Sequence, residues 1–227
     1  KVVPAEIVTA PLSFEQVVTL SNALKTLEQD GAKGSQDGAL YGFGVHLNAE
    51  VTGIDDPFTL RTIRAFAVLD PFLRHAFPVD LTRRILPFIK AWPDAFTRQL
   101  VENRPGNMAH IMELAAHHTP SRNYALDLFP LFKEADPRAF EVAFPDDTAT
   151  KPRPSFHFRL PDSRMGERGW SLLEAWNMWR LIERVAHDPR TLEALQKQWL
   201  QDHDNGQSRQ TEEAAARTDA LLKAHLS

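Results

Sequence analysis

The sequence predicts an α+β fold, in which a few extended segments form one curved layer and helices make up most of the remaining chain. Two segments, residues 41–51 and 155–160, alternate apolar and polar residues with the period of a β-strand. Elsewhere apolar residues recur at the spacing of an α-helix, most clearly from residue 172 onward. Together these patterns favour a mixed fold whose strands carry polar side chains on one face.

The composition of the 227 residues is that of a globular protein, with 43% hydrophobic and 25% charged residues. The formal net charge of −4 does not indicate a nucleic-acid partner. No run of about eighteen apolar residues occurs, so a membrane span is not expected. The absence of cysteine excludes disulfide bonds and thiol catalysis. We therefore expect a cytoplasmic protein that contacts neither nucleic acid nor membrane.

The first predicted strand covers Val2–Thr9, which is rich in β-branched residues and ends before Pro11. It carries one acid, Glu6. An acid in an apolar strand either protects a sheet edge or contacts a metal or substrate, and the pattern leaves both open. Because the chain begins within this strand-like pattern, we expect that further sequence precedes it.

Helices are predicted where capping residues precede apolar residues at helical spacing. Ser13 and Gln16 have the spacing of a capping box before a helix over residues 14–29. Asp56 followed by Pro57 begins a long apolar helix that we expect to be buried. Further helices are predicted at 93–102, 107–117, around 126–131, from 137, at 172–185, at 189–200 and at 211–226.

Residues 41–51 form the most informative segment. If they are extended, His46, Asn48 and Glu50 point to one face and the apolar residues between them to the other. The glycines at 42 and 44 remove side chains just before His46, which lets another strand or a ligand approach the backbone. The pattern fits a ligand-binding strand, and it also fits an ordinary amphipathic strand with a solvated face.

Residues 151–164 repeat this pattern. Ser155, His157 and Arg159 share one face of a strand. The other face carries Phe156, Phe158 and Leu160. Lysine and arginine are dense in this segment, which suits a phosphate or a carboxylate. Two such strands side by side would place His46 with His157 and Arg159 on one wall.

Residues 81–89 contain Arg83 and Arg84 beside apolar neighbours. We interpret both as surface arginines whose aliphatic stems cover apolar surface. A contact with an anion is the alternative.

Five ordered blocks resemble the bacterial putative amidoligase family: VPAEIVTAPL, YGFGVHLNAE, TRRILPFI, TPSRNYALDLFPLF and KPRPSFHFRLPDSR. That family belongs to the carboxylate-amine ligase group, related to glutamine synthetase and glutamate-cysteine ligase. The resemblance implies an antiparallel curved sheet of the glutamine synthetase catalytic type, packed on one face by several helices, with a helical C-terminal region. We therefore expect an amidoligase-like catalytic domain at residues 1–187 and a C-terminal helical extension at 188–227.

The resemblance also implies roles for individual residues. In the group, a glycine-rich strand ending in histidine supplies a divalent-metal ligand and a nucleotide-phosphate contact, and His46 and Asn48 occupy those positions. A second strand supplies a metal ligand and an arginine; here His157 replaces the usual acid, and Arg159 is present. Glu6 matches an acid near the metals. The predicted site is therefore catalytic Arg159 and Arg122, nucleotide-binding Asn48, Lys151, Arg153 and Asn123, and metal-binding Glu6, His46 and His157.

The reaction implied by the resemblance is ATP-dependent formation of an amide or peptide bond through an acyl phosphate, with Mg²⁺ or Mn²⁺ as the metal. Its partners would be a small-molecule or peptide carboxylate and an amine, and a homo-oligomer is compatible with it. One alternative is a catalytically silent binding or assembly module that retains the fold. Another is a metal-dependent hydrolase using His46 and His157, although the helical His pair or Cys ligands usual for catalytic zinc are missing.

Overall fold

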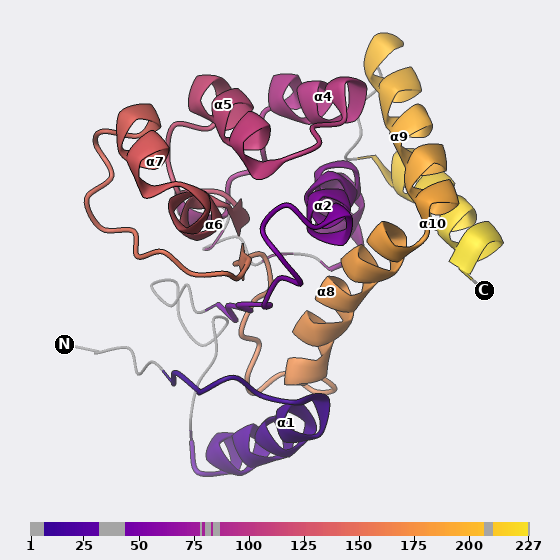
Figure 1. Ribbon diagram of the computed structural model, residues 1–227. Coiled ribbons are helices and arrows are strands. Elements are labelled where there is room, and N and C mark those ends of the chain that lie inside the picture. The colour runs from indigo at the N-terminus through magenta and orange to yellow at the C-terminus, as the bar shows by residue number, and fades with distance from the viewer. Residues whose placement is uncertain are drawn as a thin grey trace.

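Figure 1 shows the computed structural model, which describes residues 7–31, 44–77, 79, 83, 87–206 and 211–226. Helices dominate these ranges, and a short antiparallel sheet lies among them, consistent with an α+β fold. None of the helices in these ranges is both long and apolar enough to cross a membrane. In chain order the elements are α1 (Phe14–Gln29), α2 (Pro57–Ala76), the 3-10 turn η2 (Pro87–Ile89), α4 (Asp94–Asn103), α5 (Met108–His118), β1 (Leu126–Asp127), α6 (Phe129–Ala135), α7 (Pro137–Ala143), β2 (His157–Phe158), α8 (Leu172–His187), α9 (Pro189–Asp204) and α10 (Glu212–Leu226).

The sheet is centred on the strand that contains β2. β1 pairs with β2 in antiparallel register, with Leu126 opposite Phe158. On the other side of β2, residues 44–50 run antiparallel to residues 155–162. The two segments with a strand pattern therefore lie side by side, as predicted, although residues 41–43 fall outside the described ranges. The bridges that extend the layer are Gly44 to Asp162, Leu47 to Phe158, Glu50 to Ser155 and, in parallel, Lys90 to Tyr124.

The two faces of this layer differ as the alternating pattern predicted. His46, Asn48 and Glu50 are exposed, and the residues between them are partly buried. In the neighbouring strand, Phe156 and Phe158 are buried and belong to the main apolar cluster. One face of the layer is therefore polar, and the core lies against the other.

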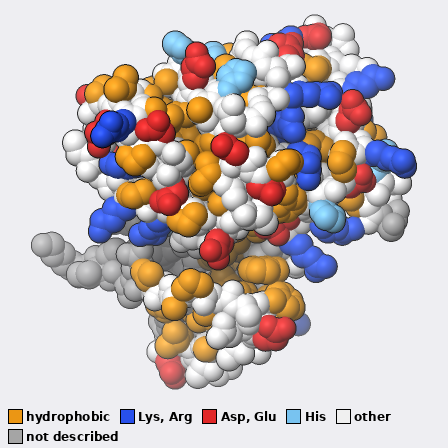
Figure 2. Space-filling model, in the orientation of Figure 1, with side chains coloured by type: hydrophobic (Ala, Val, Ile, Leu, Met, Phe, Trp, Pro, Cys, Tyr) orange, Lys and Arg blue, Asp and Glu red, His pale blue; other side chains and the backbone are white. Residues whose placement is uncertain are grey.

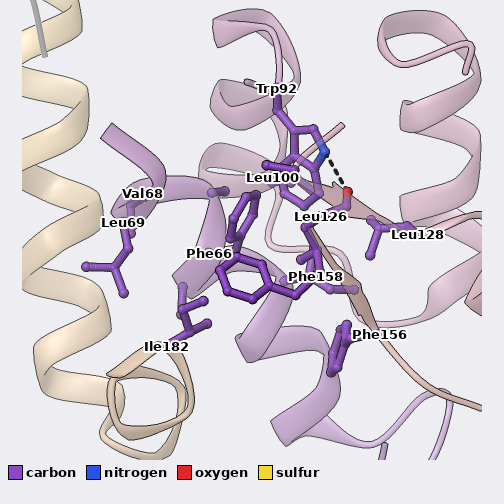
Figure 3. Packing of buried hydrophobic residues seen from close by; sticks show 14 of the residues in the cluster. Phe66, Val68, Leu69, Trp92, Leu100, Leu126, Leu128, Phe156, Phe158 and Ile182 are labelled. Atoms are coloured by element: carbon purple, nitrogen blue, oxygen red, sulfur yellow. Dashed lines mark hydrogen bonds between the residues drawn. The ribbon is translucent and has the colours of Figure 1, made fainter. Parts of the chain in front are cut away.

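The apolar face packs on α2 and α8 through aromatic rings, several of which Figure 3 shows. Phe66 of α2 lies edge-on to Trp92, with 4.8 Å between ring centroids, and to Phe158 at 6.1 Å. Trp179 of α8 approaches Phe158 at 5.5 Å. Tilted and edge-on ring pairs stabilise a core beyond the area they bury. The buried Trp92 Nε1 donates a hydrogen bond to the Leu126 carbonyl at 3.2 Å, so the ring also anchors β1.

The other helices surround α2, as Figure 1 shows. α4 to α7 pack in sequence on one side of it, α8 to α10 pack on the other, and α1 packs on α8. Leu192, Leu195 and Trp199 of α9 belong to the same apolar cluster as the residues of α2. The domain boundary expected after residue 187 falls between α8 and α9, and the division into two domains stays a prediction.

Three Asp-Pro pairs begin three of the helices. Asp56, Asp136 and Asp188 each accept hydrogen bonds from backbone N–H groups in the first turn of α2, α7 and α9. The proline that follows each of them occupies the start of the helix, where no N–H partner is needed. The capping box predicted for α1 is also present, with Ser13 N donating to Gln16 Oε1 at 2.7 Å and Gln16 N donating to Ser13 Oγ at 3.4 Å.

One helix begins later than predicted. A helix containing Leu126 was expected, but Leu126 and Asp127 form β1, and α6 starts at Phe129. Asp127 Oδ1 accepts a hydrogen bond from Phe129 N at 3.0 Å, and Pro130 occupies the first turn. These two features start the helix after Leu128, and pairing with β2 takes the preceding residues into the sheet.

The interpretation of Arg83 as a surface arginine is wrong, because only 4% of the residue is exposed. Its guanidinium lies against the backbone of a β-bulge. Between the bridges of Gly44 and Leu47, the edge segment advances from 44 to 47, three residues, while its partner advances from 158 to 162, four residues. The Pro161 carbonyl still accepts a hydrogen bond from Val45 N at 3.0 Å, whereas the Arg159 and Leu160 carbonyls accept from no backbone N–H of the described residues.

The Arg83 guanidinium forms hydrogen bonds with the backbone of this bulge. It donates to the carbonyl oxygens of Arg159 at 2.8 Å, Leu160 at 3.2 Å and Pro161 at 2.6 Å, and it forms an ion pair with Asp162 at 2.5 Å. Both members of the ion pair are almost fully buried, so the charges compensate each other away from water. Arg83 therefore stabilises the bulge instead of covering the surface.

The bulge predicts a strict requirement for glycine at position 44. A Cβ on Gly44 would lie 2.6 Å from Arg83 Nη2 and 2.9 Å from Arg83 Cζ. The guanidinium cannot move away without breaking its ion pair with Asp162 and its hydrogen bonds to the bulge carbonyls. We expect Gly44→Ala to lower the free energy of unfolding by about 1–3 kcal/mol, measured by chemical denaturation.

Gly106→Ala is the matched control, because a Cβ at Gly106 would meet no atom within 4 Å. This variant should unfold at nearly the same denaturant concentration as the wild type. If the two variants lost the same stability, the close packing of Arg83 against Gly44 would be contradicted.

Candidate functional site

Asp127 lies on the polar face of the sheet and is only 1% exposed. β1 places it opposite His157 of β2. Its Oδ1 accepts the hydrogen bond from Phe129 N that starts α6. Its Oδ2 faces Arg159 Nη2 at 2.5 Å, His157 Nδ1 at 3.4 Å and Arg122 Nε at 3.5 Å. Asp127 therefore gathers three nitrogen-bearing side chains around one buried negative charge.

Arg159 points inward and is 5% exposed. Besides Asp127, it contacts the Arg122 carbonyl through Nη1 at 2.9 Å and His157 Nε2 through Nε at 3.4 Å. Burial lowers the pKa of Arg159, the Asp127 carboxylate raises it, and the charge of Arg122 lowers it. An arginine remains protonated despite such shifts. The Arg159 guanidinium is therefore positively charged, and each of its three nitrogens contacts a protein group.

His46 approaches His157 from the neighbouring segment. The ring centroids are 5.3 Å apart and the ring planes meet at 69°. The pKa of His46 is lowered to about 4, first because protein atoms displace water around the ring, although the residue keeps exposed surface, and then because His157, Arg159 and Arg83 are close. The pKa of His157 is also lowered, mainly by burial and despite its contact with Asp127. Both imidazoles are therefore neutral at pH 7.

These five residues, Asp127, Arg159, Arg122, His157 and His46, form what we call the polar cluster. It carries a net positive charge at neutral pH, because two guanidinium groups share one carboxylate and both imidazoles are neutral. Guanidinium groups match carboxylate and phosphate oxygens in geometry and charge. The polar cluster is therefore suited to an anion, whereas the same charges would repel a divalent cation.

The side chains that can touch a bound molecule lie at the rim of the polar cluster. The Arg122 side chain is 33% exposed. His46 and Asn48 are exposed on the same face. Arg159 and Asp127 lie behind them, with their polar atoms directed at protein groups. The buried pair therefore positions the rim, and the rim is available for contact.

The structure brings together most of the residues predicted from the two strands. His46, His157, Arg159 and Arg122 meet in the polar cluster, and Asn48 lies on the same face. Asn123 follows Arg122 directly, but the contacts described for it are those of its backbone, from its N–H to Ser121 Oγ and from Lys90 N to its carbonyl.

The remaining predicted residues are not joined to the polar cluster by any contact described for them. Lys151 and Arg153 are exposed on the segment that leads into the strand of β2. Arg153 N donates to the Pro130 carbonyl at 3.2 Å, which anchors the backbone and leaves the side chain at the surface. Glu6 lies outside the described residues. The roles of these three residues stay predictions.

Asp127 was not selected from the sequence, although it is the centre of the polar cluster. A signal was present, since it is the single acid in the apolar run ALDLF. A carboxylate buried in such a run requires a charged or hydrogen-bonding partner. That partner, Arg159, lies more than thirty residues away and is brought close only by strand pairing.

A metal site is not formed by the part of the chain that the structure describes, where no three His, Cys, Asp or Glu residues are grouped to hold an ion. A cavity of about 10 Å³ lies beside Asp127, and its other polar lining residues include Thr119, Ser121 and Tyr124. It has room for about one water molecule and is too small for a nucleotide. The metal roles of His46 and His157 therefore stay predictions.

The central position of Asp127 predicts a large loss of stability when its charge is removed. In Asp127→Asn the buried guanidinium of Arg159 would lose its counter-ion, and we expect the free energy of unfolding to fall by about 3–5 kcal/mol. Glu102→Gln is the control, because it weakens an exposed pair with Arg98 and should leave the free energy of unfolding nearly unchanged. Equal effects in chemical denaturation would contradict a structural role for Asp127.

The low pKa of His46 predicts a specific pH dependence. The unfolded chain binds a proton on His46 near the ordinary value of 6.5, and the folded chain does so near 4. The contribution of His46 to stability is therefore complete above about pH 6.5 and declines as the pH falls toward 4. We expect His46→Gln to reduce the loss of thermal stability over that interval. An NMR titration that placed the ring near pH 6.5 would contradict this expectation.

Comparison with known proteins identifies the family. The sequence model of the family described as putative amidoligase enzyme matches residues 1–181, a range that includes the whole polar cluster. No curated protein matches the chain, and no solved structure does. Because the match covers most of the sequence, the chain belongs to the putative amidoligase enzyme family.

Proposed function

We propose that the protein is an ATP-dependent carboxylate-amine ligase that forms an amide or peptide bond through an acyl-phosphate intermediate. Membership of the amidoligase family supports ligase chemistry. The observation that carries the proposal is the polar cluster, in which Asp127 holds Arg159 behind the partly exposed Arg122. Such a cluster suits the carboxylate and phosphate groups that this reaction brings together.

In the proposed reaction, an oxygen of the substrate carboxylate attacks the γ-phosphorus of ATP. A new P–O bond forms, the bond from the γ-phosphorus to the bridging oxygen breaks, and ADP leaves with the electron pair. The amine nitrogen then attacks the acyl carbon, inorganic phosphate leaves, and the amine proton passes to solvent. Neither step requires a protein nucleophile, so catalysis depends on positioning and on charge neutralisation.

We assign these tasks to the chain's own residues by their exposure. Arg122 at the rim would bind the reacting carboxylate or phosphate, and Asn48 would donate a hydrogen bond to a phosphate oxygen. Neutral His46 would complete the rim without adding charge. Arg159, predicted as catalytic, fits a positioning role better, because its guanidinium is directed at Asp127 and other protein groups.

The other predicted contacts belong to the same proposal. Lys151 and Arg153 would reach the triphosphate from the exposed segment before β2, and Asn123 would orient the nucleotide or the carboxylate. Mg²⁺ or Mn²⁺ would accompany ATP and neutralise its phosphate charge. The described residues do not offer a donor set for such an ion, so no step is assigned to a metal held by the protein.

The proposal extends to the architecture. On the resemblance of the sequence blocks, we assign the layer of residues 44–50, 155–162 and β1 to an antiparallel curved sheet of the glutamine synthetase type. The same resemblance supports a catalytic domain that ends near residue 187 and a helical extension after it.

A second candidate function is a catalytically silent binding module. The donors of Arg159 are directed at protein groups, and the described residues form no metal site, which favours this alternative. Isothermal titration with ATP separates the two functions. A ligase should release or absorb heat that depends on Mg²⁺, whereas a silent module should not.

The ligase proposal predicts that Arg122→Ala lowers turnover by about 100-fold, because a partly desolvated cation facing the reacting phosphate is removed. ADP release would be measured with ATP, Mg²⁺ and a panel of amino acids and dicarboxylates, with hydroxylamine as a general amine that traps an acyl phosphate as a hydroxamate. Thermal stability should change little, because Arg122 is partly exposed and its contact with Asp127 is long, with 3.5 Å between the nearest atoms.

Arg138→Ala is the matched control, because Arg138 is exposed on α7 and should leave turnover at the wild-type level. Unchanged ADP release in Arg122→Ala would contradict the role of the polar cluster. Absence of any carboxylate-dependent ADP release in the wild type, together with no Mg²⁺-dependent heat, would support the silent module.

A further inference from the structure

A second cationic site lies where two interhelical turns meet the first half of α2. The turn between α4 and α5 is tied to the start of α2 by a hydrogen bond from Met108 N to Asp55 Oδ1 at 2.7 Å. The end of α8 is tied to α2 by a hydrogen bond from Arg61 Nε to the Ala186 carbonyl at 2.7 Å. These contacts hold the two turns together around one face of α2.

Three arginines lie near this place, since the charges of Arg61 and Arg104 act on Arg64, and we call Arg61, Arg64 and Arg104 the arginine junction. Arg61 and Arg64 are three residues apart on α2 and therefore lie on the same helical face. Arg104 follows α4 in the left-handed region, with φ of 46°, and its Nη2 lies 3.3 Å from Glu193 Oε1 of α9. Figure 2 shows lysine and arginine side chains gathered over the region where α2, α4 and α9 meet.

Arg64 is the unusual member of the arginine junction. Its Nε is shielded from solvent and has no hydrogen-bond partner within the described part of the chain. Burial lowers the pKa of Arg64, and the positive charges of Arg104 and Arg61 lower it further. A partly buried cation among other cations is unfavourable unless an anion compensates it.

The nearby carboxylates make their described contacts with groups other than Arg64. Asp55 accepts the hydrogen bond from Met108 N, and Asp188 caps α9 by accepting from Arg190 N. Glu193 pairs with Arg104, but both side chains are more than half exposed, which makes the pair weak. None of the contacts given for these carboxylates reaches Arg64, so its guanidinium has no ion-pair partner in the described part of the chain.

The arginine junction is separate from the polar cluster. At about 100° per residue, Arg61 and Arg64 lie roughly 140–160° around α2 from Phe66. Phe66 packs against Phe158 on the apolar side of the sheet. α2 and the sheet therefore stand between the arginine junction and the polar face that carries Asp127.

We propose that the arginine junction binds a phosphate group, free or as part of a small molecule, as a second anion site. A phosphate carries more than one negative charge at neutral pH and accepts hydrogen bonds in several directions. It can therefore contact arginines that come from α2 and from the turn after α4. A carboxylate has two oxygens in one plane and suits a single guanidinium fork better. The bound phosphate would also hold the turns between α4 and α5 and between α8 and α9 against α2.

The test compares thermal unfolding of the full chain in inorganic phosphate and in chloride at equal ionic strength. Phosphate stabilises many proteins without binding a specific site, so the difference between variants carries the test. We expect phosphate to raise the Tm of the wild type and of Arg138→Gln, a control on α7, and we expect Arg64→Gln to lose most of that rise. The apparent phosphate affinity of Arg64→Gln should fall about tenfold, because a charge-assisted hydrogen bond is removed.

Two further comparisons make the outcome decisive. In chloride alone, Arg64→Gln should unfold at the wild-type temperature or higher, because the substitution removes an uncompensated charge. The proposal is overturned if Arg64→Gln keeps the whole rise. Malonate, as a carboxylate probe, should produce a smaller difference between the wild type and Arg64→Gln. Neither result depends on whether the protein is a ligase.

Discussion

The buried ion pair of Asp127 and Arg159 is the interaction on which the sheet and the candidate site both depend. It joins β1 to the strand that contains β2, and removal of two charges from water costs several kcal/mol for each ion. That cost is offset because each partner makes further hydrogen bonds, Asp127 with Phe129 N and Arg159 with the Arg122 carbonyl. The pair consequently fixes where His157 and the rim of the polar cluster can lie.

Two buried arginines stabilise one short stretch of strand in different ways. Arg83 lies among the bulge carbonyls of residues 159–161 and stabilises an irregular backbone. Arg159 lies on the polar face and holds Asp127. The bulge follows Phe158 directly, so the same strand packs its apolar side on Phe66 and then departs from regular pairing beside the polar cluster. Bulges of this kind often occur beside functional sites because they redirect side chains.

Much of the fold could be predicted from local sequence. The strand period separated His46 and Asn48 from the core, and Asp-Pro pairs marked the starts of three helices. Two features could not be predicted in this way. Asp127 was hidden in an apolar run, and Arg83 resembled a surface arginine, because each has a partner that lies far away in the sequence.

The sequence by itself determined the family, the faces of the two strands and most helix starts, because these depend on residue order and on spacings of a few residues. Only the tertiary structure decided which charges are compensated. Burial and long-range pairing joined Asp127 to Arg159 and Asp162 to Arg83, while Arg64 was left among like charges. The free energy of a charge depends on its distance from water and from other charges, and the folded chain sets both.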